Sequence, residues 1–110
     1  MKESQIQRAC LDLLESLRLA GKPVKATRTN AGKIQTATGE WVRLCSPGWG
    51  DITASVNGQP VMIECKRTKG GVQSKEQKKC QQEWERSGGI YLLVDSMSVL
   101  KAFLASVGIM

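Results

Sequence analysis

The sequence predicts an α/β domain in which helices flank a mixed β-sheet, and three observations support this prediction. Segments with a helical period alternate with short apolar segments. The dipeptide Asn57-Gly58 separates two of the short segments, as in a tight β-hairpin. Residues 90–94 form a continuous apolar run, which is typical of a strand buried on both faces. The order helix, strands with a hairpin, helix, strand and helix is typical of a layered α/β fold.

The first predicted helix spans 4–20. Its apolar side chains recur at helical spacing, and Gly21 with Pro23 ends it. A short strand is expected over 24–29. After it comes a stretch rich in Gly, Thr and Ser, which we expect to be a loop with one short strand around 41–44.

The two strands of the predicted hairpin span 51–56 and 61–66. A polar helix is then expected over 74–87, opened by the capping pattern Ser74-x-x-Gln77. The apolar strand over 90–94 follows it, and Asp95 or Ser96 begins a final apolar helix.

Length and charge bound the possible functions. The chain has 110 residues, which predicts one small domain over 1–110. Its formal net charge of +6 favours a polyanionic partner, nucleic acid before an anionic membrane surface. We find no signal pattern and no apolar run near the roughly 20 residues of a membrane span. We therefore expect a cytoplasmic protein without a membrane partner.

The cysteines argue against zinc chemistry. The chain has four, Cys10, Cys45, Cys65 and Cys80, and none forms a CxxC pair. It has no histidine, so a zinc site of paired spacing is not expected and catalysis by histidine is excluded. Buried free thiols in a reducing compartment are the favoured interpretation.

The hairpin places two acidic residues opposite each other. If the turn has two residues, Asp51 faces Glu64, and directly opposed Cβ atoms lie about 4.5–5.5 Å apart. Like charges at that distance repel, so we expect a positive group between them. Lys66 reaches from one side only, whereas a divalent cation could bridge both carboxylates and also take the backbone carbonyl of Cys65. A solvated acidic cluster is the alternative, and a longer hairpin loop would shift this register.

Two further polar residues are candidates for the same site. Glu3 lies on the apolar side of the first helix and could reach the sheet edge, although a first-turn Glu also complements the helix dipole. Gln77 could line the site or serve only in the capping box. Trp41 and Trp49 could stack on bases, although packing in the core is the commoner role.

The chain matches the Asp…Glu-x-Lys pattern of the PD-(D/E)xK nuclease superfamily. The match consists of Asp51, twelve intervening residues and then Glu64-Cys65-Lys66. Further short matches follow in the same order along the chain: Glu3 in the first helix, Asn30 to Gly32, Trp41 to Arg43, Pro47 to Ile52, Glu64 to Arg67, Gln73 to Gln77 and Gly88 to Tyr91. Over nearly the whole chain the sequence resembles the virus-type replication-repair nuclease (VRR-NUC) domain. One departure is Gly50, where that family usually has Pro.

The resemblance implies a restriction-endonuclease-like αβββαβ core and a Mg²⁺- or Mn²⁺-dependent endonuclease, a hydrolase of phosphodiester bonds without an organic cofactor. Asp51 and Glu64 would hold the metal, with Glu3 as a further ligand. Lys66 would orient or help to deprotonate the attacking water, and Gln77 would support the site. Such chemistry requires neither histidine nor a covalent nucleophile.

Small enzymes of this family are phage-type homodimers that cut branched DNA such as Holliday junctions, so the resemblance implies a homodimer that acts in the cytoplasm of a host cell. Paired cuts need two subunits, because one site cuts one strand. Cleavage of flaps or simple duplex, and DNA binding without cleavage, are the alternatives. The candidate phosphate-contacting residues are Lys33, Arg43, Arg67, Lys69 and Lys75.

Overall fold

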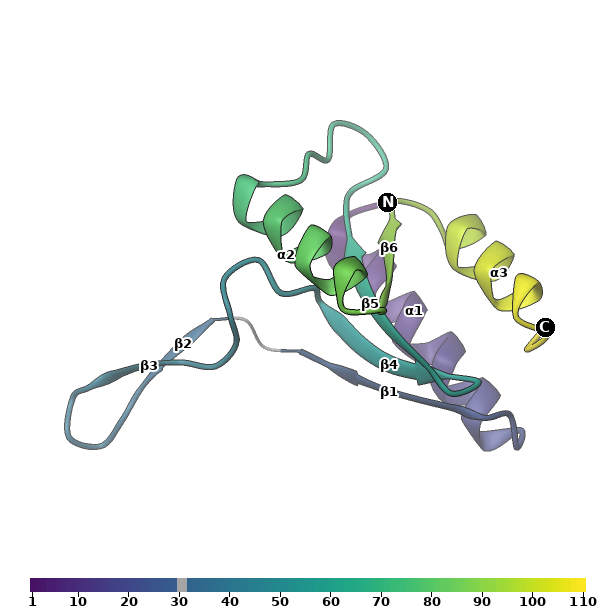
Figure 1. Ribbon diagram of the computed structural model, residues 1–110, viewed down its shortest axis with the longest axis horizontal. Helices are drawn as coiled ribbons and strands as arrows, with labels where there is room; N and C mark the ends of the chain where they lie inside the picture. Colours follow the sequence, from purple (N-terminus) through teal and green to yellow (C-terminus); the bar gives the residue numbers. More distant parts are fainter. Residues whose placement is uncertain (30–31) are drawn as a thin grey trace.

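A four-stranded mixed sheet forms the centre of the computed structural model, which describes residues 1–29 and 32–110 (Figure 1). Its strands lie in the order β1 (Val24–Arg28), β4 (Ile52–Val56), β5 (Gln59–Cys65) and β6 (Ile90–Val94). β4 runs antiparallel to both of its neighbours, β1 and β5, and β6 runs parallel to β5. The predicted α/β class with a mixed sheet is thereby confirmed. Asn30 and Ala31, which belong to one of the matched motifs, lie outside the described residues.

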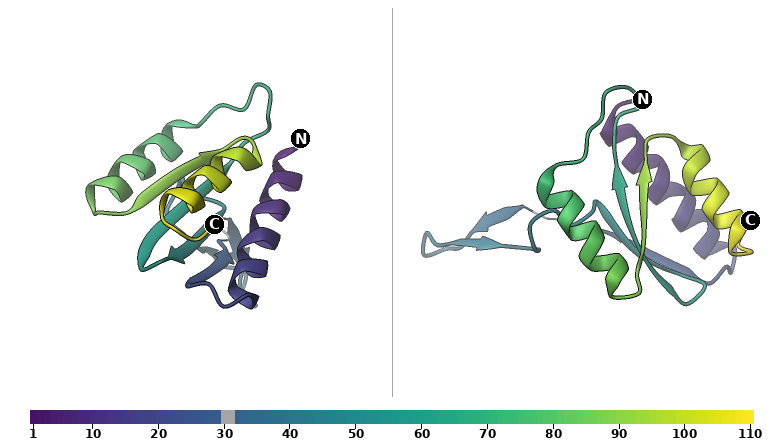
Figure 2. Two further views of the ribbon diagram at one scale, coloured as in Figure 1. Left: turned by 90° about the vertical axis from the view of Figure 1, so that its right-hand side faces the viewer. Right: turned by 45° about the horizontal axis from the view of Figure 1, so that its top comes forward.

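Helices cover both faces of this sheet. The helices α1 (Glu3–Leu19) and α3 (Met97–Ser106) pack on one face, and α2 (Lys75–Arg86) lies on the other (Figure 2). The core between the sheet and the α1–α3 layer contains the most completely buried apolar side chains. Among them are Ile6, Leu14, Val61, Ile63, Leu100 and Leu104. The removal of these side chains from water is the main stabilising contribution to the fold. Packing of Ile6 in this core holds the start of α1 against the sheet.

The hairpin has the predicted register. Asn57 and Gly58 both have positive φ, 50° and 80°, as a two-residue type I′ turn requires. Ile52 therefore pairs with Ile63, and Thr53 with Met62. One position further along the same register, Asp51 comes opposite Glu64.

The predicted loop before β4 contains a second, unexpected strand. β2 (Lys33–Gln35) pairs antiparallel with β3 (Trp41–Arg43), and the two form a separate sheet that projects from the body (Figure 1). We call this pair the arm. Its turn is closed by the Thr36 N–H, which donates to the Glu40 carbonyl over 2.8 Å, and by Gly39 at φ +88°. Only β3 was predicted, because three residues of mixed polarity carry too little periodicity to reveal β2.

The predicted helix starts agree with the structure except in one side chain. The Ser74 hydroxyl accepts from the Gln77 N–H over 3.1 Å, and the Gln77 side-chain carbonyl accepts from the Ser74 N–H over 2.8 Å. This is the predicted capping box. Ser96 is the N-cap of α3, but its hydroxyl pairs with that of Ser98 instead of capping the helix.

The four cysteines are free, as predicted, but only two are buried. Cys10 and Cys65 lie in the core, whereas Cys45 and Cys80 are half-buried. The expectation of burial is therefore wrong for Cys45 and Cys80. Cys80 lies on α2, which has no fully buried residue. Within the described ranges, no helix combines the length and the apolar character needed to cross a membrane.

Candidate active site

Five of the predicted site residues come from four elements that meet at one end of the sheet. Asp51 immediately precedes β4, Glu64 is the penultimate residue of β5, and Lys66 follows that strand. Glu3 opens α1 and Gln77 lies in the first turn of α2. The Thr68 N–H donates to the Met1 carbonyl over 3.3 Å and so joins the start of α1 to the segment after β5.

Asp51 is held by the backbone of the neighbouring strand. Its Oδ2 accepts from the Cys65 N–H over 2.7 Å, which turns the carboxylate toward the end of β5. The residue before it must be glycine, because a β-carbon at Gly50 would lie 2.7 Å from Met62 Cγ and 2.9 Å from the Ile63 carbonyl. The Gly50 N–H also lies 3.3 Å from Met62 Sδ. Both contacts are incompatible with proline, so this departure from the family pattern has a local steric reason.

Glu64 is the most unusual residue of the site. The residue is buried with 2% exposure, and its Oε1 accepts from Gln77 Nε2 over 2.8 Å. Its Oε2 is buried and has no hydrogen-bond partner among the described residues. Burial raises the pKa of Glu64 to about 7, and the negative charge of Asp51 adds to this rise while Lys66 opposes it. The register predicted from the turn therefore places two mutually repelling carboxylates together.

Gln77 fills both of the roles that the sequence left open. The oxygen of its side-chain amide accepts from Ser74 in the capping box, and the nitrogen donates to Glu64. An amide can do both because it carries an acceptor and two donor hydrogens on separate atoms. The start of α2 thereby fixes the orientation of the buried carboxylate.

Lys66 lies between two acidic side chains. Its Nζ is 3.5 Å from Glu64 Oε1 and 4.0 Å from Glu3 Oε1, and only 12% of its side chain is exposed. Glu3 is 54% exposed, so it borders the site from the solvent side. Over residues 1–29 and 32–110, no three His, Cys, Asp or Glu side chains are arranged to hold one ion. Glu3 contacts Lys66, and its role as a further metal ligand stays a prediction.

The arrangement fits a hard divalent cation. Two carboxylates lie across one hairpin, and one of them has a buried oxygen that lacks a partner in the described part of the chain. Mg²⁺ takes one or two protein carboxylates and fills its other positions with water and phosphate oxygens. Asp51 and Glu64 would hold such an ion, and the Cys65 carbonyl stays a predicted further ligand at the same strand end.

The predicted DNA-binding residues fall into three separate groups. Lys33 and Arg43 face each other across the arm. Arg67 and Lys69 line a hollow of about 530 Å³ that Glu3 also borders, directly beside the candidate site. Lys75 lies at the start of α2 and lines another hollow. The basic charge therefore extends from the arm to both helices that meet at the site.

A hydrogen-bonded group beside the site was not assigned from the sequence. Tyr91 pairs with Met62 across β5 and β6, and its buried hydroxyl accepts from Gln73 Nε2 over 3.1 Å. The same nitrogen donates to Gln81 Oε1 over 2.9 Å. Burial raises the pKa of Tyr91 to about 12, so the phenol stays neutral and acts as a structural hydrogen-bonding group. Only its place in a matched motif, within Gly88 to Tyr91, marked it in the sequence.

The two candidate stacking tryptophans differ. Trp49 packs edge-on against Trp84, with ring centroids 5.4 Å apart, and its Nε1 donates to Thr53 Oγ1 over 3.0 Å. Trp41, on the arm, is 67% exposed. Packing, the commoner role, therefore accounts for Trp49 and not for Trp41.

Comparison of the chain with protein-family models, with curated proteins and with solved structures gave no match. The resemblance to the VRR-NUC domain therefore stays a prediction that depends on the residues named above.

Proposed function

We propose that the protein is a Mg²⁺- or Mn²⁺-dependent endonuclease with a restriction-endonuclease-like core, acting on phosphodiester bonds of DNA. The observation that carries the proposal is the buried Glu64 carboxylate beside Asp51, with one oxygen that lacks a hydrogen-bond partner among the described residues. Burying a carboxylate next to another destabilises a fold unless a cation compensates for the charge. A divalent ion bound between the two carboxylates would compensate for their charge.

Two residues around Glu64, Lys66 and Gln77, would have separate roles in this hydrolysis. When bound, the cation would supply neutralisation of charge on the phosphodiester and acidification of a water molecule. The reaction adds the water oxygen to phosphorus and breaks one phosphorus–oxygen ester bond, while the water proton leaves and the departing oxygen gains one. Lys66 Nζ, 3.5 Å from Glu64 Oε1, would orient the water and stabilise charge on the phosphate. Gln77 holds Glu64 in position.

The distribution of charge favours a branched substrate. The basic residues occur on the arm, beside Glu3 and at the start of α2, so they could contact more than one DNA segment. A homodimer would supply the two sites needed for paired cuts in a Holliday junction. Cleavage of flaps or simple duplex is the second candidate, and DNA binding without cleavage is the third.

Incubating the protein with labelled four-way junction, flap or linear duplex DNA in Mg²⁺ or Mn²⁺ separates these candidates. Paired nicks in the junction support the proposal, and preferred cutting of flap or duplex supports the second candidate. Glu64→Gln and Lys66→Gln should abolish cutting while DNA is still bound, whereas Glu85→Gln, an exposed change on α2, should leave cutting intact. Tight binding with no cleavage in either metal would overturn the proposal.

A further inference from the structure

The arm has two chemically different faces. Residues in its strands pair as Lys33 with Arg43, Ile34 with Val42 and Gln35 with Trp41. Because side chains alternate between the faces of a strand, one face carries only Ile34 and Val42. The opposite one, which we call the basic–aromatic face, carries Lys33, Gln35, Trp41 and Arg43.

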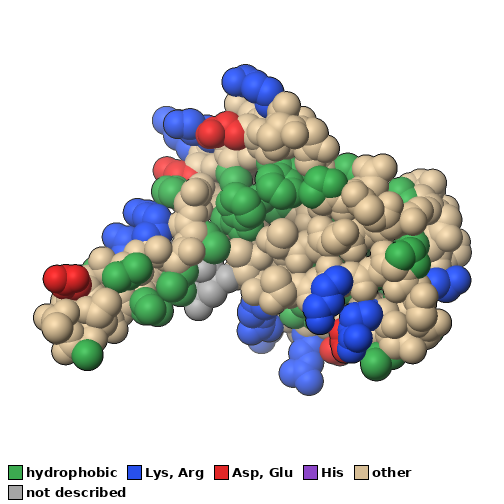
Figure 3. Space-filling view, turned by 60° about the horizontal axis from the view of Figure 1, so that its bottom comes forward, with side chains coloured by type: hydrophobic (Ala, Val, Ile, Leu, Met, Phe, Trp, Pro, Cys, Tyr) green, Lys and Arg blue, Asp and Glu red, His purple; other side chains and the backbone are tan. Residues whose placement is uncertain are grey.

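The basic–aromatic face is open to a partner. Every residue of β2 and β3 is exposed, and the indole of Trp41 is 67% exposed. Figure 3 shows hydrophobic side chains along the arm and Lys or Arg side chains beside its base. The other two tryptophans of the chain each donate a hydrogen bond through Nε1 and pack against each other.

The charge on this face selects the class of partner. Two cations face each other across the strands, and none of its four positions is acidic. Glu40 lies in the turn, outside the two strands that form this face. Phosphates complement the two cations, and a flat base complements an exposed indole, so the combination is that of proteins that bind single-stranded nucleic acid.

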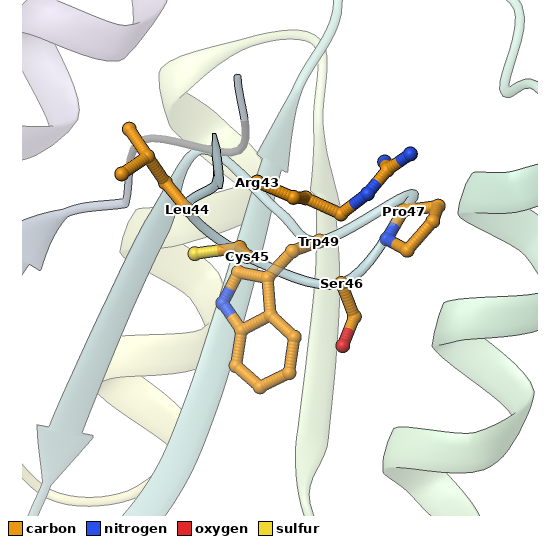
Figure 4. Close-up of a pocket in the computed structure, with 6 residues that line it drawn as sticks. All are labelled: Arg43, Leu44, Cys45, Ser46, Pro47 and Trp49. Carbon is orange, nitrogen blue, oxygen red and sulfur yellow. The ribbon is translucent and has the colours of Figure 1, made fainter. Parts of the chain in front are cut away.

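The base of the arm leads toward the candidate active site. Arg43 borders a hollow of about 540 Å³ whose other lining residues are Leu44, Cys45, Ser46, Pro47 and Trp49 (Figure 4). Trp49 is two residues before Asp51, so their Cα atoms lie within about 7 Å of each other. The hollow at the base of the arm is therefore lined by a residue close in the chain to Asp51.

We propose that the basic–aromatic face binds an unpaired segment of a DNA strand, with Trp41 stacking on a base and with Lys33 and Arg43 contacting the adjacent phosphates. The inference rests on the proposed function, since it names the part of a branched substrate that the arm receives. The binding itself requires neither a metal ion nor cleavage.

Fluorescence anisotropy of a labelled dodecathymidylate, titrated with the full chain in EDTA, tests the inference. Trp41→Ala should raise the Kd about tenfold or more, as loss of one stacked base does, whereas Trp41→Phe should stay within about threefold of wild type. Arg43→Gln should reduce the slope of log Kd against log salt by about 0.7, since it removes one phosphate contact. Val42→Ala, on the opposite face of the same strand, should bind as wild type does, and circular dichroism confirms that each variant is folded.

Two results would overturn the inference. One is wild-type affinity in Trp41→Ala. The other is an equal loss in Trp41→Ala and Val42→Ala together with a change in sedimentation, which would identify the arm as a contact with a second copy. Failure of the proposed function is distinguishable, because a protein that cleaves nothing but loses oligonucleotide binding with Trp41→Ala still supports the inference.

Discussion

Glu64 should make the protein less stable as the pH rises. A carboxyl group has a pKa of 4.5 when free in the unfolded chain and of about 7 at this position in the folded chain. Between these two pH values the folded state holds a proton that the unfolded state has released. The stabilisation is therefore fully present below about pH 4.5 and is lost as the pH rises through 7.

The size of the effect follows from the same two pKa values. A rise from 4.5 to about 7 corresponds to about 3 kcal/mol, at about 1.4 kcal/mol for each tenfold change in acidity. We expect about 2 kcal/mol, because Asp51, whose charge contributes to the rise, is only half-buried and water screens part of its field. Glu64→Gln removes the charge but keeps an oxygen that can accept from Gln77.

Urea unfolding in EDTA, followed by circular dichroism at pH 5, 6, 7 and 8, measures this effect. The free energy of unfolding of Glu64→Gln should exceed that of wild type by about 2 kcal/mol at pH 8 and by little at pH 5. Glu85→Gln, an exposed carboxylate on α2, should follow wild type at every pH. A difference between Glu64→Gln and wild type that does not change with pH would refute the argument that a buried, repelled carboxylate lies at this position.

Three further predictions concern the same end of the molecule. Mg²⁺ should raise the urea midpoint of wild type more at pH 8 than at pH 5, since a protonated Glu64 binds it poorly, and an equal effect on Glu64→Gln would place the ion elsewhere. At pH 8, Gln77→Glu should destabilise the protein more than Gln77→Ala does, because it adds a carboxylate beside Glu64; at pH 5 it should not. Equal destabilisation by the two variants at both pH values would contradict this. Gly48→Ala should lower the free energy of unfolding by about 3 kcal/mol, because its β-carbon would collide with the Glu76 carbonyl. Gly58→Ala, also at φ +80° but in open space, should lower it by about 1 kcal/mol. Similar losses for the two variants in urea unfolding would show that the collision is relieved.

The features that were predicted correctly depend on neighbours in the chain. The Asn57-Gly58 turn determined the hairpin register, because a two-residue loop leaves only one pairing of its strands, and that register placed Asp51 opposite Glu64. The capping box of α2 also involves residues only three positions apart. β2 was missed because its three residues form a strand only when β3 is paired with them.

The sequence by itself determined the mixed α/β class, the hairpin and the pair of facing acidic residues, since periodicity and turn chemistry act over a few residues. Only the tertiary structure decided that Glu64 is buried, that Gln77 both caps α2 and holds Glu64, and that Glu3 meets Lys66. It also separated the packed Trp49 from the exposed Trp41. These properties depend on which remote elements pack together, and burial and electrostatic repulsion are set by that packing.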